Sequence, residues 1–137
     1  MTIMELIEII NSAKQLNVYE ARIENSKITM SCINGLEMND VSATNVKISD
    51  ANLSDLEIHG AQMGGAYIHS IGMPPEGHLY YDPNAKQRPL KFDDCDLHGS
   101  TITDCNLSKV AIANCNLTGM TINGVLVEDL LRVYKDK

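Results

Sequence analysis

Three cysteines lie ten residues apart, at Cys95, Cys105 and Cys115, and their type and spacing are the first feature that could do chemistry. Thiolates at regular intervals suggest a metal site. Zinc, however, needs ligands that converge on one point, and structural sites usually supply them in closely spaced pairs. Each of these cysteines instead opens a similar five-residue stretch, where a small residue is expected to pack inward. Core packing is therefore the better interpretation, and we expect no metal and no cofactor.

The four histidines offer a second possible chemistry, that of a general acid or base. They stand at positions 59, 69, 78 and 98, and no serine, cysteine or carboxylate stands beside them in the spacing of a catalytic set. An enzyme that uses His78 and the neighbouring tyrosines would need a concave site there. The sequence predicts no such concavity, so we expect a protein that is not an enzyme.

Composition narrows the class of protein further. A chain of 137 residues is enough for one domain with a sizeable core. Its net charge of -7 argues against binding to nucleic acid or to an anionic membrane, since both need basic patches. It has no run of residues apolar enough to cross a bilayer, and its N-terminus does not resemble a signal peptide. We therefore expect reduced cysteines and a cytoplasmic location.

All of these side chains must be positioned by a five-residue sequence repeat. Residues 51–55 (ANLSD) are repeated almost letter for letter at 105–109 (CNLSK) and 115–119 (CNLTG). Similar units tile residues 16–75 and 90–129. We call the third residue of each unit its centre and the first its flank. No centre or flank carries a charge, although 21% of the chain is charged, so the pattern is not chance.

A period of five fits neither a helix, with a period of 3.6, nor a strand, with a period of 2. One apolar residue at a fixed place in every short unit is typical of a solenoid, in which stacked coils share a continuous core. Aromatic residues make up only 4% of the chain, so this core must be built from aliphatic side chains.

The units resemble those of the pentapeptide-repeat family, whose pattern is close to A-[DN]-L-x-x. The resemblance covers about residues 16–129. It implies an all-β solenoid, a right-handed four-sided (quadrilateral) β-helix of about five coils, in which four units make a coil of about 20 residues. Like residues do recur 20 apart, as in Lys27 and Lys47, Glu37 and Glu57, and Cys95 and Cys115.

Short helices are expected to cover the two ends of the coils. Residues 1–15 are predicted to form an N-terminal capping helix. Thr2 and Glu5 form a capping box there, and the apolar residues of 3–14 fall on one helical face. The alternative, a helix on a membrane surface, would need lysine and arginine on its polar face, whereas this one carries glutamates.

Residues 128–137 are predicted to form the C-terminal capping helix. Its acidic residues come first and its basic residues last, as the helix dipole prefers. The resemblance implies a twofold contact through this helix. A homodimer would then be held by Leu130, Leu131 and Tyr134.

Residues 76–89 interrupt the repeat and form an inserted loop. Loops of this length without structure of their own are commonly functional. Tyrosines beside charged residues are also typical of protein interfaces. The candidate partner-binding residues in the loop are His78, Leu79, Tyr80, Tyr81, Asp82, Lys86 and Arg88. The alternative is that the loop folds back to cover the change of phase between the two blocks of coils.

Four acidic residues are expected on one wall of the solenoid: Glu20, Glu37, Asp40 and Glu57. They form either a solvated face or a surface for a basic partner, with Glu37 and Glu57 as its candidate contacts. The sequence thus predicts a non-enzymatic scaffold that binds an unidentified protein, with no direct contact to nucleic acid or membrane. The alternative is an acidic rod that mimics DNA and binds DNA gyrase or topoisomerase, as in the branch of the family that confers quinolone resistance.

Overall fold

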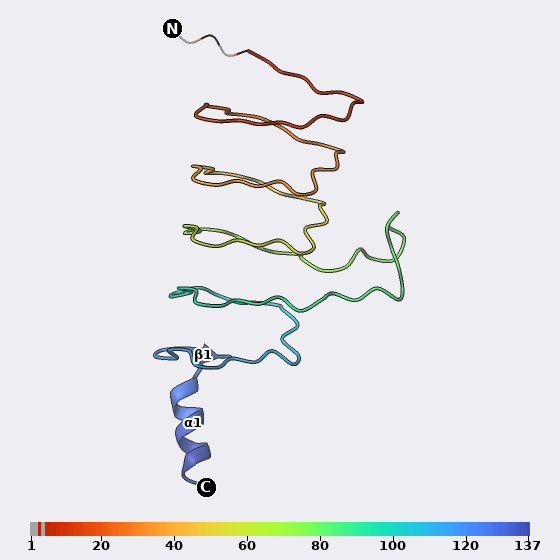
Figure 1. Cartoon of the computed structure of the whole chain (residues 1–137). Helices are drawn as coiled ribbons and strands as arrows, with labels where there is room; N and C mark the ends of the chain where they lie inside the picture. Colours follow the sequence, from red (N-terminus) through yellow and green to blue (C-terminus); the bar gives the residue numbers. More distant parts are fainter. Residues whose placement is uncertain (1–2, 4) are drawn as a thin grey trace. The chain divides into compact units, whose positions relative to one another are not determined.

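The computed structural model describes residues 3 and 5–137, and the chain divides into two compact units, Met1–Gln62 and Met63–Lys137. We call them the N-terminal unit and the C-terminal unit. Within the N-terminal unit the chain winds through successive flattened coils, coloured red to yellow-green in Figure 1. The C-terminal unit contains the inserted loop in green, further coils, and one helix at the C-terminus.

Every repeat unit, apart from those that end at Pro75 and Asp129, ends in a residue with left-handed backbone conformation, where the chain turns a corner. The fifth residue of each unit has a φ between +47° and +80°. Glycine, asparagine and aspartate tolerate this conformation best. The five-residue period of the sequence is therefore present in the backbone. The corner residues are Glu20, Asn25, Met30, Gly35, Asp40, Asn45, Asp50, Asp55 and Gly60, then Gly65, Ser70, Asp94, Gly99, Asp104, Lys109, Asn114, Gly119 and Gly124.

There are two kinds of corner, which alternate from Met30 to Ser70 and from Asp94 to Gly119, whereas the corners at Glu20, Asn25 and Met30 are all of the second kind. At a turn corner, the N–H of the next unit's flank donates to the carbonyl of the centre, as from Leu56 to Leu53 at 3.1 Å. A positive φ at the third residue of such a turn is the signature of a type II turn. At a bend corner the chain changes direction without this bond, as at Asp50 and Gly60.

Side chains fasten each kind of corner in a different way. At several turn corners the second residue of the unit is Asn or Asp, and its Oδ1 accepts the N–H of the fourth residue, as from Ser54 to Asn52 at 3.1 Å. The same bond recurs at Asp96, Asn106 and Asn116. This Asx turn preorganises the corner and explains why the repeat pattern favours Asn or Asp at its second position.

At bend corners the flank of the next unit supplies the fastening. Cys95, Cys105 and Cys115 each donate from Sγ to the carbonyl two residues earlier, at 3.2 to 3.3 Å. Ser31 does the same with its hydroxyl, at 2.8 Å. The ten-residue spacing of the cysteines therefore follows from the alternation of the corners.

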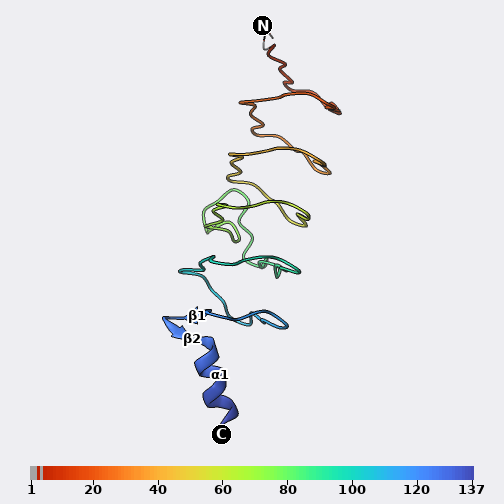
Figure 2. The same cartoon turned by 90° about the vertical axis from the view of Figure 1, so that its left-hand side faces the viewer.

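The coils are not joined to one another by a β-ladder. Among residues 3 and 5–137, the backbone bonds of the coils link residues three apart within a single corner. The centres remain exposed, with Ile48 at 60%. Figures 1 and 2 both show the successive coils of the N-terminal unit separated from each other. The corners form because they are made by local residues, whereas the ladder of a β-helix would depend on contacts 20 residues apart.

A small cap ends the C-terminal unit. Strands β1 (Thr121–Ile122) and β2 (Val125–Leu126) pair antiparallel, with Ile122 opposite Val125. The two residues between them are Asn-Gly with positive φ at both positions, as a type I′ hairpin turn requires. The repeat is predicted to continue to residue 129; the corner at Gly124 is part of this hairpin turn, and residues 127–129 of the last unit begin a helix.

Helix α1 (Val127–Lys135) follows β2 directly, where the sequence predicts a C-terminal helix. The N–H of Val127 donates to the carbonyl of Met120 at 3.0 Å, and a Glu128 carboxylate oxygen accepts the N–H of Gly119 at 3.2 Å. Val127 is the one buried hydrophobic side chain among the described residues, at 8% exposure. The carboxylate and the buried valine fix α1 to the last corner.

The N-terminal capping helix is a wrong prediction for the residues that the structure describes there. Residues 3 and 5–15 are irregular, with a bend at 11–12, and Thr2 of the expected capping box lies outside the described residues. A helix this short is marginal in water unless its apolar face packs on something. Here Ile3, Leu6 and Ile7 are exposed, so that support is missing.

The corners predict opposite effects for one substitution at two sites. Lys109 holds a left-handed φ of +64°, so Lys109→Gly should raise the free energy of unfolding by about 1 kcal/mol. Lys47 has no positive φ, so Lys47→Gly should lower it by roughly 0.5 to 1 kcal/mol. Urea unfolding of both variants measures this. Equal effects of the same sign would show that the corner at Lys109 is not left-handed.

Candidate partner-binding surfaces

The inserted loop is built from three consecutive turns. The N–H of His78 donates to the carbonyl of Pro75 at 3.1 Å, with Gly77 at a φ of +88° inside the turn. Two further bonds run from Tyr81 to His78 at 2.9 Å and from Ala85 to Asp82 at 3.2 Å. Residues 75–85 therefore form a run of hydrogen-bonded turns.

Two side chains strengthen these turns. Nδ1 of His78 accepts the N–H of Tyr80 at 3.2 Å, and the two rings lie 5.9 Å apart at a tilt of 46°. Oδ1 of Asp82 accepts the N–H of Asn84 at 2.9 Å. Of the predicted contact residues, His78 and Asp82 thus shape the loop.

The turns leave the large apolar side chains of the loop in solvent. Leu79 is 85% exposed and Tyr80 is 76% exposed, whereas Tyr81 is 42% exposed. Lys86 and Arg88 follow in the same loop and are also exposed. Tyrosine beside leucine offers a large contact area at little cost in side-chain entropy. This part of the loop is a surface that a protein partner could cover.

An ion pair lies just after the loop. Nζ of Lys91 donates to Oδ2 of Asp93 at 2.9 Å, and both side chains are exposed. They are the second and fourth residues of one unit, so they point outward on either side of the centre. Arg22 and Glu24, also the second and fourth residues of a unit, form an ion pair at 3.5 Å. Tyr67 and His69 occupy the same two positions in another unit, and their rings stack with centroids 4.3 Å apart.

The Lys91 ammonium lowers the pKa of Asp93, first through its hydrogen bond and then through its charge. Lys91→Met should therefore raise the pKa of Asp93 toward its ordinary value, which NMR titration of the carboxyl carbon would measure. The pair adds stability above the ordinary carboxyl pKa and loses it as the pH falls through the lowered pKa. Lys86→Met is the control and should leave the Asp93 titration unchanged. An unchanged pKa in Lys91→Met would refute the pair.

The predicted acidic wall is only partly reproduced. Glu37 and Glu57 are second residues of their units and are exposed on the sides of consecutive coils. Glu20 and Asp40 are corner residues with positive φ. Two of the four acids therefore lie on sides and two at corners, and Glu37 and Glu57 remain the side-chain candidates for a basic partner.

Helix α1 presents the predicted dimer residues on its surface. Leu130 and Leu131 are about half exposed, at 47% and 46%, and Tyr134 is more exposed. Asp129 and Arg132 form an ion pair at 2.9 Å beside them. Leu130 and Tyr134 are four residues apart and share one face of the helix.

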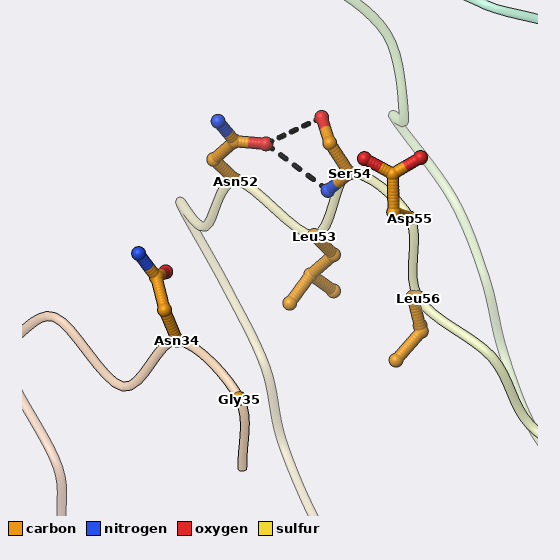
Figure 3. Close-up of a pocket in the computed structure, with 7 residues that line it drawn as sticks. All are labelled: Asn34, Gly35, Asn52, Leu53, Ser54, Asp55 and Leu56. Carbon is orange, nitrogen blue, oxygen red and sulfur yellow. Dashed lines mark hydrogen bonds between the residues drawn. The ribbon is translucent and has the colours of Figure 1, made fainter.

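A pocket of about 370 Å³ lies between two consecutive coils of the N-terminal unit. It is lined by Asn34 and Gly35 on one coil and by residues 52–56 on the next (Figure 3). Asn34 and Ser54 are 20 residues apart, so the pocket is the open space between equivalent corners. It lacks the cluster of ionisable side chains expected of a catalytic site.

The cysteines were considered above as possible metal ligands, and the histidines as possible general acids or bases. Among residues 3 and 5–137, no three His, Cys, Asp or Glu side chains come together in a way that could hold a metal ion. All four cysteines are free thiols. The same part of the chain contains no helix of the length and apolar character needed to cross a membrane.

Comparison with known proteins supports the repeat. The family model for pentapeptide repeats matches residues 91–125, in eight copies. The resemblance inferred from the sequence is confirmed by this match. Neither the search of curated proteins nor the search of solved structures found a match. The family model thus supports the repeat over residues 91–125, and the corners at every fifth residue show the same period in residues 16–70.

Proposed function

We propose that this pentapeptide-repeat chain is a non-enzymatic scaffold whose inserted loop binds another protein. Pentapeptide-repeat proteins are generally scaffolds of this kind. The observation that carries the proposal is the loop itself, because three turns hold residues 75–85 while the side chains of Leu79 and Tyr80 are largely exposed. Side chains of this size are costly to expose unless something covers them.

The scaffold in this proposal is a right-handed, four-sided β-helix of stacked coils. The corners support it, since a left-handed residue ends the unit at every fifth position and bend and turn corners alternate from Met30 to Ser70 and from Asp94 to Gly119. The exposed centres support it as well. Stacking would bury them and pair the open coil edges, at a gain of about 25 cal/mol for each Å² of apolar surface.

Two further surfaces belong to the same proposal. The apolar face of α1, with Leu130 and Tyr134, would join two copies into a homodimer. The outward acids Glu37 and Glu57 would contribute a weaker, salt-sensitive contact to a basic region of the partner. Neither surface supplies the anchor residues that the loop supplies.

Affinity capture tests the proposal. The intact chain and a variant whose residues 76–89 are replaced by a short Gly-Ser linker would be exposed to lysate of the source cell. We expect a protein that is captured by the intact chain and lost with the variant. A circular dichroism spectrum shared by both chains is the control for folding. Capture of the same protein by both chains would contradict binding through the loop.

The second candidate is an acidic rod that binds DNA gyrase in place of DNA. The observation in its favour is the net charge of -7, with Glu37 and Glu57 recurring one coil apart. A supercoiling assay would decide between the two. Inhibition that is lost in Glu37→Gln/Glu57→Gln and kept in the linker variant would favour the DNA mimic over the loop scaffold.

A further inference from the structure

The chain contains two Asn-Gly dipeptides, Asn34-Gly35 and Asn123-Gly124. An asparagine side chain before glycine is open to attack by the next backbone nitrogen, because glycine has no side chain to block the approach. Whether the reaction occurs depends on how firmly the backbone is held. The two sites differ in this respect.

Asn123 and Gly124 lie in a firmly held hairpin turn. Strands β1 and β2 pair on either side of them, with Ile122 opposite Val125 and Thr121 opposite Leu126. The buried Val127 and helix α1 follow immediately. Movement of the Gly124 nitrogen toward the Asn123 side chain would require the pairing next to the turn to open.

Asn34 and Gly35 lie at a corner that is held by one bond. The N–H of Leu36 donates to the carbonyl of Ile33 at 3.2 Å, the long end of the normal range. Within the part of the chain that the structure describes, the Asn34 amide makes no hydrogen bond, whereas Asn52 in the next coil accepts two bonds from Ser54. Figure 3 shows this difference at the open pocket between the two coils.

We propose that Asn34 is a site of spontaneous deamidation and that the hairpin protects Asn123 from the same reaction. The Gly35 nitrogen loses its proton to hydroxide and attacks Cγ of Asn34. The new N–Cγ bond closes a cyclic imide, the Cγ–Nδ2 bond breaks, and ammonia leaves. Water then opens the imide at either carbonyl, which yields aspartate or isoaspartate.

The reaction would change the coil as well as its charge. Either product adds one negative charge at a corner of the N-terminal unit. Isoaspartate also adds a methylene to the backbone between residues 34 and 35, so the short turn from Ile33 to Leu36 could not keep its geometry. Reaction at Asn34 is therefore expected to loosen one corner of the coil and leave the cap with α1 unchanged.

Peptide mapping by mass spectrometry tests this inference on the full chain, incubated at mildly alkaline pH in its folded state and in urea. We expect similar rates at Asn34 and Asn123 in urea. In the folded chain, Asn34 should react several-fold faster than Asn123. Asn106, which precedes leucine and whose Oδ1 is bonded to Ser108, is the slow internal reference.

Two variants sharpen the result. Asn34→Gln lengthens the side chain by one methylene, so the same cyclic imide cannot form. This variant should abolish the fast reaction at residue 34 without affecting the reaction at Asn123. Leu36→Pro removes the N–H that closes the turn and should make Asn34 react faster still. Equal folded-state rates at Asn34 and Asn123, or a folded-state rate at Asn34 as slow as that at Asn106, would overturn the inference.

Discussion

Val127→Asp is expected to destabilise the C-terminal cap by about 3 kcal/mol, the largest effect of any single substitution that we predict. Val127 is 8% exposed, and its N–H bonds to Met120 while its neighbour Glu128 bonds to Gly119. A carboxylate at this position would lose its hydration without a partner. The dipole of α1 favours an acid in its first turn, but only by up to about 1 kcal/mol, so desolvation decides the sign.

Val133→Asp is the matched control on the same helix. Val133 is 58% exposed, so the same change there should cost no more than about 1 kcal/mol, mostly from the unfavourable dipole near the helix end. Urea unfolding followed by circular dichroism would measure both variants. If Val127→Asp unfolds at the same urea concentration as Val133→Asp, then Val127 is not the apolar anchor of the cap.

Tyr80→Ala is expected to weaken binding of the captured partner by about 2 kcal/mol, or about thirtyfold in Kd. The ring is 76% exposed on the loop and lies against His78, so it is both accessible and oriented. Leu79→Ala should add a further loss, since the two side chains are adjacent. Isothermal titration calorimetry with the purified partner measures the change.

Tyr19→Ala is the control for this experiment. Tyr19 is 80% exposed, close to the value for Tyr80, and belongs to a repeat unit rather than to the loop. Its loss should leave the affinity unchanged. An equal loss of affinity in Tyr19→Ala and Tyr80→Ala would assign recognition to exposed rings in general and not to the loop.

The positions of the corners could be predicted from the sequence because every five-residue unit has the same pattern. Centres, flanks and the five-residue period all reappear in the structure as corners at every fifth residue. The corner residues carry a further signal in the sequence. Of the eighteen left-handed corners, fourteen are occupied by Gly, Asn or Asp, which are the residues that tolerate a positive φ. That composition alone would have located the corners.

The loop was located by its lack of repeat, and its turns could also have been predicted. Pro-Glu-Gly at 75–77 and Asp-Pro-Asn at 82–84 are strong turn sequences, and both form turns in the structure. The use of His78 as a side-chain acceptor has no comparable signal, because it depends on the conformation of the turn after it.

The N-terminal helix is a wrong prediction because a short helix needs both an apolar face and a surface on which that face packs, and the sequence pattern shows only the face. The apolar spacing of Ile3, Leu6 and Ile7 defines a face, but nothing in the sequence says what the face would pack against. The cysteines show the same limit. Their role as donors at bend corners depends on the alternation of corner types, which becomes visible only in the backbone.

Amide hydrogen exchange of the intact chain tests the central claim most directly, namely that the coils form a stacked scaffold that holds out a loop. The stacked β-helix predicts that amides beside the centres, such as those of Ile48 and Leu107, exchange at least about a hundredfold more slowly than the amide of Leu79. Slow coils with a fast loop would support the account. Coil amides that exchange as fast as the loop would show that the coils do not stack in solution and would contradict the proposed β-helix.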